Sequence, residues 1–233
     1  MGIYDHVLDS AAVPLGTLIG SDFTRQDDAT DGGAFDYTAV ASGTIAILAG
    51  DGGWAKISAV ATTDASGGQV QAVGGHSVAT GKNIIFKAAA KLNESSTTDV
   101  ATQSQEYIGL FPVDTSIDAS LPDDGVYFVK ADGANTVQCV TRVGGTNQAA
   151  TTIPTDDFIM DKNINRYGIT VMPGGNLASN VEFNINGRTV ARHTNVSLPA
   201  STVFLTPSLA FRSGDTNGTR LIESEVGHSV KFR

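Results

Sequence analysis

Cysteine and positive charge are both scarce in this chain of 233 residues. Cys139 is the one cysteine, so the chain can form no internal disulfide and no cysteine-based zinc cage. The 15 lysines and arginines are outnumbered by 24 acidic residues, and the resulting net charge of -9 repels nucleic acid. We therefore expect no nucleic-acid partner.

Long apolar runs are missing as well. No window approaches the roughly 18 consecutive apolar residues that a membrane span needs, and the first residues lack the basic start and apolar stretch of a secretion signal. The sequence therefore predicts a soluble protein without membrane contact. Hydrophobic residues make up 41% of the chain, which suffices for the core of one large β domain or two small ones.

Apolar side chains recur with a period of two along most of the chain, between clusters of Gly, Asn, Asp and Pro. This alternation is typical of strands that bury one face. It predicts strands over residues 54–60, 83–92, 106–111, 125–130, 136–143, 167–172, 181–185, 189–193, 207–211 and 229–233. Many short strands with hardly a helix predict an all-β protein, either a sandwich or a barrel.

The strongest local signal is a hairpin around Asn186-Gly187. Asn and Gly tolerate the positive φ angles of a type I′ turn, whose twist matches that of paired strands. Alternating runs flank the dipeptide, so the sequence predicts a tight hairpin over residues 181–192. Cys139 lies in another alternating run, and we interpret it as a small buried hydrophobic residue rather than a reactive thiol.

The first 20 residues form a segment of their own, because Pro14, Gly16 and Gly20 separate them from the rest. We expect an N-terminal arm over residues 1–20 and one β domain over residues 21–233; a frayed terminus or a first strand are the alternatives for the arm. The arm holds more apolar side chains than a free terminus should, and we predict that they bind a partner. These residues are Ile3, Tyr4, Val7, Leu8, Val13, Leu15, Leu18 and Ile19.

Catalytic motifs are missing from the sequence. There is no Gly-x-Ser-x-Gly elbow and no phosphate-binding loop that leads into a helix. The histidines have no metal-type spacing, although a folded sheet could still bring His193 and His228 together. Glu223 and Glu225 place two carboxylates on one strand face, as glycoside hydrolysis requires, but no third acid or aromatic side chain accompanies them. We therefore predict no catalytic residues and no enzymatic activity.

Calcium is an open alternative, because the chain contains clusters of acidic residues that suit this ion. The candidates are Asp114 with Asp118, Asp123 with Asp124, and Asp156 and Asp157 with Asp161. None of these clusters has the spacing of a twelve-residue calcium loop, so we predict no cofactor and leave a structural calcium ion open.

The sequence also gives only weak evidence of aromatic platforms that could bind sugars. Trp54 is the one tryptophan, and its alternating run with Ile57 favours packing in or at the edge of the core. Tyr107 and Tyr127 lie on predicted strands and suit packing within a sheet. The residues alone therefore give little support to a lectin-like site.

Five segments along the chain together make up a further pattern, namely residues 106–111, 124–133, 140–146, 181–192 and 205–214. This pattern resembles one that recurs in virion proteins of tailed bacteriophages, and residues 22–23 and 52–54 are similar to the opening strands of that family. The likeness covers residues 21–233 and concerns structural motifs. It implies a two-sheet antiparallel jelly-roll sandwich of the concanavalin-A-like type, preceded by the short N-terminal arm.

The resemblance also implies a function. In the first place it implies a non-enzymatic phage structural protein of the virion, made in the host cytoplasm, that decorates or cements the capsid. Its partners would be the major capsid protein, bound through the arm and the sandwich edge, and other copies of itself in a trimer. The chain lacks the Glu-x-Asp-x-x-Glu strand of laminarinase-like hydrolases, which disfavours catalysis. The alternative is a glycan-binding adhesin or tail-fibre domain, which would have an exposed groove with Trp54 or a tyrosine beside an acidic calcium site.

Overall fold

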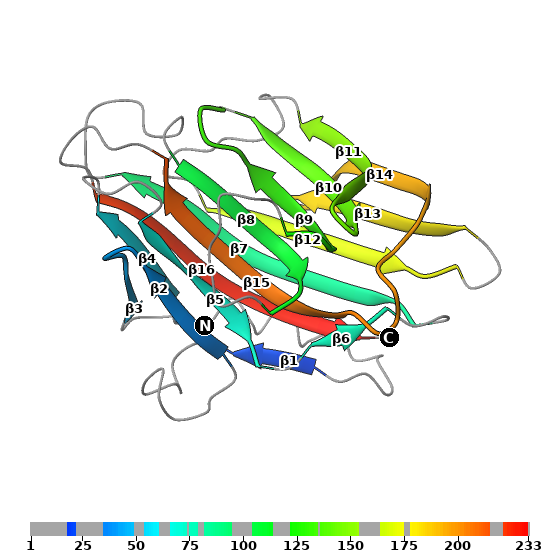
Figure 1. Cartoon of the computed structure of the whole chain (residues 1–233), viewed down its shortest axis with the longest axis horizontal. Helices are drawn as coiled ribbons and strands as arrows, with labels where there is room; N and C mark the ends of the chain where they lie inside the picture. The colour runs from blue at the N-terminus through cyan, green and yellow to red at the C-terminus, as the bar shows by residue number, and fades with distance from the viewer. Residues whose placement is uncertain are drawn as a thin grey trace.

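The protein is all-β in every segment that the computed structural model describes, and its strands form two antiparallel sheets (Figure 1). No helix that could cross a membrane occurs in these segments. The structure describes residues 18–21, 35–48, 54–60, 66–73, 75–78, 82–94, 104–113, 122–134, 136–153, 164–174, 178–214 and 221–232.

Sheet A contains the strands that follow one another in space in the order β14 (Arg188–Val196), β13 (Ser179–Ile185), β12 (Asn165–Met172), β7 (Ile84–Glu94), β16 (Leu221–Phe232), β4 (Trp54–Val60) and β3 (Thr44–Leu48). The short strand β1 (Leu18–Ser21) pairs with the end of β16. The central strands β7 and β16 are the longest of the sheet and are paired over eleven positions.

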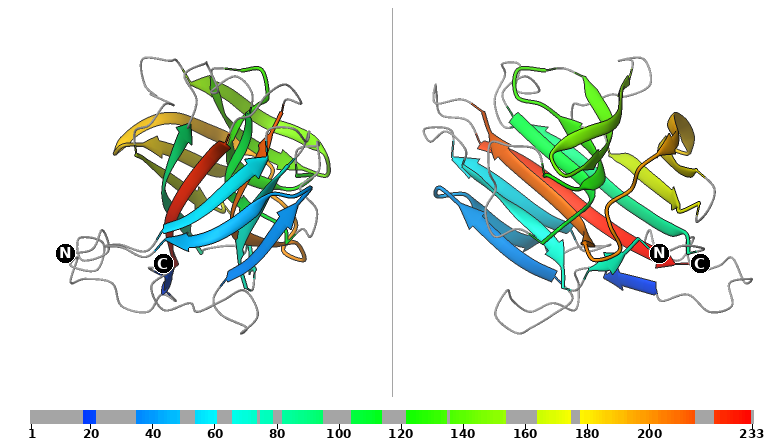
Figure 2. Two further views of the ribbon diagram at one scale, coloured as in Figure 1. Left: turned by 90° about the vertical axis from the view of Figure 1, so that its left-hand side faces the viewer. Right: turned by 45° about the vertical axis from the view of Figure 1, so that its right-hand side comes forward.

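Sheet B contains the strands β11 (Thr146–Ile153), β10 (Val137–Val143), β9 (Gly125–Lys130), β8 (Ser104–Phe111), β15 (Phe204–Ser213), β5 (Gly67–Ala72) and β2 (Phe35–Val40), in that order. The two-residue strand β6 (His76–Ser77) pairs with the start of β15. The two sheets form two layers of a sandwich, which the three views show from different sides (Figures 1 and 2).

The core lies between the sheets and is built from the alternating side chains that face inward. On β12 the side chains of Tyr167, Ile169 and Val171 are buried, whereas the residues between them are partly exposed. Phe128 on β9 of the opposite sheet meets Tyr167 and Phe183 edge to face, with ring centroids 5.1 and 5.3 Å apart. These contacts join the two layers, because aromatic pairs at such distances add to the stabilisation from burial.

The hairpin predicted at Asn186-Gly187 is confirmed. Asn186 has a φ of 52° and Gly187 a φ of 86°, and Ile185 pairs with Arg188 across the turn. Both φ angles lie in the left-handed region, which a residue with a branched Cβ adopts only at a cost. Cys139 is also buried as predicted, in the core between the sheets.

All ten predicted strands are found, with shifted ends in most cases. The prediction of a strand over residues 229–233 was too short, because β16 begins at Leu221 and contains Glu223 and Glu225 in the centre of sheet A. Six strands were not predicted: β1, β2, β3, β5, β6 and β11. Part of the predicted arm, Leu18 to Gly20, pairs with β16 as β1, whereas residues 1–17 lie outside the described residues.

Candidate functional site

The face of sheet B that points away from sheet A is unlike an ordinary solvated sheet face. Every residue of β8 and β9 is buried, so both faces of these two strands are shielded from water. On β8, Ile108 and Leu110 face the core, and Tyr107 and Phe111 face outward. The outward side chains belong to a second buried group, which we call the outer cluster: Tyr107, Phe111, Tyr127, Val129, Val140 and Ala210.

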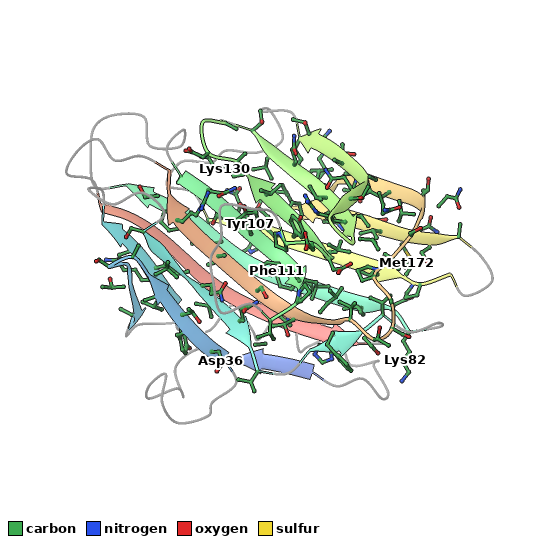
Figure 3. The ribbon with its side chains drawn as sticks, viewed as in Figure 1. Asp36, Lys82, Tyr107, Phe111, Lys130 and Met172 are labelled. Atoms are coloured by element: carbon green, nitrogen blue, oxygen red, sulfur yellow. The ribbon has the colours of Figure 1, made fainter. Side chains whose placement is uncertain are left out.

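The outer cluster is organised around Tyr127 of β9. Its ring meets the rings of Tyr107 and Phe111 nearly at right angles, at centroid distances of 6.2 and 6.1 Å. Its hydroxyl donates to the carbonyl oxygen of Pro122 over 3.3 Å. Burial is the main cause that raises the pKa of the Tyr127 phenol, and the neighbouring Arg142 guanidinium opposes the rise. The rings of this cluster are 0–3% exposed, so they offer no open platform (Figure 3).

A ladder of amides and hydroxyls continues the outer face across β5 and β15. Gln69 donates to the side-chain oxygen of Gln71 over 3.2 Å, and Gln71 donates to Ser208 Oγ over 2.9 Å. Ser208 in turn donates to the carbonyl oxygen of Thr206. Gln71 also donates to the carbonyl oxygen of Pro112, just beyond the end of β8. The ladder thus fixes where the chain leaves β8, and its polar groups satisfy one another.

The outer face becomes accessible at one end. Val73 follows β5, Val113 follows β8, and Phe204 begins β15, and these side chains are 49, 55 and 58% exposed. By the alternation of their strands all three extend the outer face, since Gln71, Phe111 and Thr206 precede or follow them by two residues. We call these three residues the exposed rim. Asp36 and Lys82, both exposed, lie apart from each other along the lower edge of the view in Figure 3.

The inner face of sheet B holds a charged pair. Glu106 on β8 and Lys130 on β9 are directly opposite each other and are both buried. The Lys130 ammonium donates to the carbonyl oxygen of Ser104. Desolvation lowers the pKa of Lys130 to about 8, although Glu106 and Asp132 both favour its charged form. At 2% exposure the Lys130 side chain cannot reach a ligand, so we assign this pair to the core.

His193 links the two sheets at the β14 edge. Its Nδ1 lies 2.8 Å from Thr141 Oγ1 on β10, and its Nε2 lies 3.2 Å from Thr151 Oγ1 on β11. Burial lowers the pKa of His193. His228 lies on β16, four strand positions from β14, so the two strands run roughly 19 Å apart at about 4.8 Å per position. The sheet therefore does not bring the two histidines together, and we assign His193 a structural role.

Most of the residues singled out by the sequence lie elsewhere or outside the described residues. Leu18 and Ile19 lie in β1, whereas Ile3, Tyr4, Val7, Leu8, Val13 and Leu15 fall outside the described residues. The side chains of Trp54, Glu223 and Glu225 are likewise not described. Tyr107 and Tyr127 pack in the sheet as predicted.

The acidic candidates for calcium are only partly described. Asp123 accepts a hydrogen bond from the amide of Gly145 through its carbonyl, and Asp124 Oδ1 accepts from the amide of Gly144 over 3.0 Å. These two residues anchor the turn between β10 and β11. The described residues contain no group of three or more acidic, histidine or cysteine side chains that could hold a metal ion. Asp114, Asp118, Asp156, Asp157 and Asp161 lie outside them.

Sequence reasoning missed the two features that distinguish the outer face. The amide ladder falls on β5, whose sequence GGQVQA carries too few apolar residues to predict a strand. Phe204 precedes the predicted strand 207–211, and its pairing with β6 is one that no local pattern reveals. A signal for the outer cluster was present, because Tyr107, Ile108, Leu110 and Phe111 make both faces of β8 apolar.

Similar solved structures share this sandwich. The carbohydrate recognition domain of Emp47p has a TM-score of 0.60 at 10% identity, and the match covers 92% of this chain and 93% of that one. A protein of unknown function from Shewanella oneidensis has a TM-score of 0.58 at 12% identity, with 99% and 94% covered. An endo-1,3-beta-glucanase from Streptomyces sioyaensis has a TM-score of 0.56 at 12% identity, with 95% and 99% covered.

The chain is therefore a concanavalin-A-like β-sandwich, and the predicted fold class is confirmed. No protein-family model matches the sequence, and no curated protein matches it either. Likeness at 10–12% identity concerns the fold, and one fold supports many functions. The function has to be argued from the site.

Proposed function

We propose that this chain is a glycan-binding module that uses the outer face of sheet B. The observation that carries the proposal is the exposed apolar rim of Phe204, Val73 and Val113, next to which the buried ladder of amides and hydroxyls fixes the chain. Sugars present apolar C–H faces and hydroxyl groups, and sites that bind them combine apolar side chains with a few placed polar groups.

The likeness to the carbohydrate recognition domain of Emp47p supports this proposal, since it extends over 92% of the chain. The net charge of -9 is compatible with it as well, because neutral glycans are not repelled by an acidic surface. The closed centre of the outer face directs binding to the rim, where side chains are accessible.

Binding of the intact chain to an array of neutral and acidic oligosaccharides tests the proposal. We expect saturable binding of at least one oligosaccharide, and a negative result over a broad array would contradict the function. Adding a chelator during the binding step shows whether calcium takes part. Unchanged binding would remove calcium from the proposal without affecting the role of the outer face.

A virion location is our second proposal, carried by the resemblance of residues 106–111, 124–133, 140–146, 181–192 and 205–214 to virion proteins of tailed phages. In that setting the chain would bind the major capsid protein as a trimer through residues 1–20. Because Leu18 to Gly20 pair with β16, the arm should be shortened only over residues 2–17, which keeps β1 in place. Undiminished binding of this deletion to purified particles would contradict the anchor.

Hydrolysis is the third function to test, because the neighbours include an endo-1,3-beta-glucanase. Glu223 and Glu225 are two residues apart on β16, so their Cα atoms are about 6.8 Å apart. We expect no release of reducing ends from a β-1,3-glucan. Release that disappears in Glu223→Gln would make the chain an enzyme and would overturn this expectation.

A further inference from the structure

Phe204 is set apart from the other aromatic residues by its exposure. Among the aromatic side chains that the structure describes, Phe204 alone is exposed; Tyr37 is half-buried and the others are buried. A large apolar side chain that remains 58% accessible while its neighbours are packed away often marks a binding surface when other apolar residues adjoin it.

The backbone of Phe204 is held in place by the short strand β6. Phe204 pairs directly with Ser77, and side chains of directly opposed residues lie on the same face about 5 Å apart. Gly75, just before β6, also lies close to this residue: a Cβ atom at position 75 would come within 2.6 Å of Phe204 Cβ. The glycine therefore permits a close approach of the two backbones, and the pairing puts Ser77 on the same face as Phe204.

Two aliphatic side chains enlarge this surface. Thr206 pairs with Phe111, and Ser208 pairs with Gln71, so the same registers extended by two residues place Val113 beside Phe204 and Val73 beside Thr206. The hydrogen bond from Gln71 to the Pro112 carbonyl fixes the chain immediately before Val113. The rim is thus a preorganised group of one aromatic and two aliphatic side chains with a hydroxyl at its border.

We infer that Phe204 is the stacking platform for an uncharged pyranose ring, with Val73 and Val113 lining its sides. This inference rests on the proposed glycan-binding function and names the site and the class of sugar. Three half-exposed side chains offer on the order of 300 Å² or less, which is well below the roughly 800 Å² per partner of a stable protein interface. The acidic chain, with a net charge of -9, disfavours polyanionic glycans.

Titration calorimetry of the full chain with four probes tests the inference: laminarihexaose, cellohexaose, an α-linked mannotriose and polyglucuronate. We expect at least one neutral probe to bind. For that probe, Phe204→Ala and Phe204→Leu should each lower the affinity about tenfold or more, because neither retains an aromatic face. Phe204→Trp should bind within about threefold of the parent chain. Gly75→Ala should weaken binding too, since it displaces the ring.

Ile164→Ala is the matched control, because Ile164 is an apolar residue of similar exposure, 48%, that lies outside the rim. Its affinity should equal that of the parent chain. Full binding by Phe204→Leu would overturn the platform and leave the glycan-binding function standing. Binding of no probe by the parent chain would overturn both the platform and the glycan-binding function. Preference for polyglucuronate would overturn the inference that the sugar is uncharged. Light scattering completes the test: self-association that Phe204→Ala abolishes would make the rim a protein interface and overturn the inference.

Discussion

At β8 and β9 both faces of sheet B are buried, but the two faces are built in different ways. The inner face meets a second sheet, and its side chains join a core that spans both layers and includes 25 buried residues among those described. The outer face closes around the six described residues of the outer cluster, and its large exposed apolar side chains are those of the rim. Along β12 in sheet A, by contrast, buried and partly exposed residues alternate in the ordinary way.

The inner face contains the side chains that specify the sandwich, whereas the outer face contains features that the sandwich does not require. Proteins of 10–12% identity share the sandwich, so many different sets of apolar side chains can fill the space between the sheets. The outer cluster, the amide ladder and the rim do not follow from the need to close a sandwich. Substitutions on the two faces can therefore be compared by their effects on the free energy of unfolding, which should be largest on the inner face.

The largest effect should come from Phe128→Ala on the inner face. Phe128 is 1% exposed and its ring contacts Tyr167 and Phe183 of the opposite sheet. Truncation leaves a cavity between the layers, and we expect a loss of about 4 kcal/mol. Urea unfolding followed by circular dichroism measures it. A loss below about 1 kcal/mol would show that the two sheets are not held together at this point.

Lys130→Ala should have the next largest effect, because it leaves the buried carboxylate of Glu106 without the opposing ammonium. Removing one partner of a buried pair costs about 3 kcal/mol. The double variant Lys130→Met with Glu106→Leu replaces both charges by apolar groups of similar size, and it should recover most of this loss. If the double variant is as unstable as the sum of the two single ones, the charges are not coupled across β8 and β9.

The sequence allowed the prediction of those strands along which apolar and polar side chains alternate. The run Val181 to Ile185 and the Asn186-Gly187 turn combine apolar alternation with turn chemistry, and this hairpin was located correctly. Strand β11, with the sequence TNQAATTI, was missed because it is an edge strand with mostly exposed side chains. Its place is set by pairing with β10, which is tertiary information.

The site was harder to predict than the fold for a physical reason. Burial on both faces of β8 shows in its sequence, SQEYIGLF, but what the outer side chains contact does not. The place of Phe204 in sheet B is set by the pairing of β15 with β6, whose residues lie more than 120 positions earlier in the chain. Gly75 has its role only through this pairing. Such long-range contacts are invisible to a local pattern.

Tyr127→Phe tests the outer face with a smaller change. The substitution keeps the ring contacts with Tyr107 and Phe111 and removes the hydroxyl that donates to the Pro122 carbonyl. We expect a loss of about 1 kcal/mol in the free energy of unfolding, as for a partly buried hydrogen bond. Glycan binding should be unchanged, because the ring is closed off from solvent. Lost binding with intact stability would show that the centre of this face, rather than the rim, contacts the sugar.

The smallest effect should be the dependence of stability on mildly acidic pH, which we attribute to His193 on the inner side of the sandwich. His193 is buried between Thr141, Thr151 and Phe183, and its pKa is lowered by desolvation. In the unfolded chain a histidine titrates near pH 6.5, so below that pH the unfolded state binds a proton that the folded state still excludes. The free energy of unfolding should therefore fall as the pH drops from 7 to 5.

Urea titrations at pH 7 and pH 5 measure this fall, and His193→Gln supplies the comparison. The variant lacks the titrating ring, so its stability should change less between the two pH values than that of the parent chain. Part of the fall should persist, because burial also lowers the pKa of His76 beside β15. Equal slopes in both chains would place the acid sensitivity outside the contact between β14 and sheet B, because desolvation of His193 at that contact is what lowers its pKa.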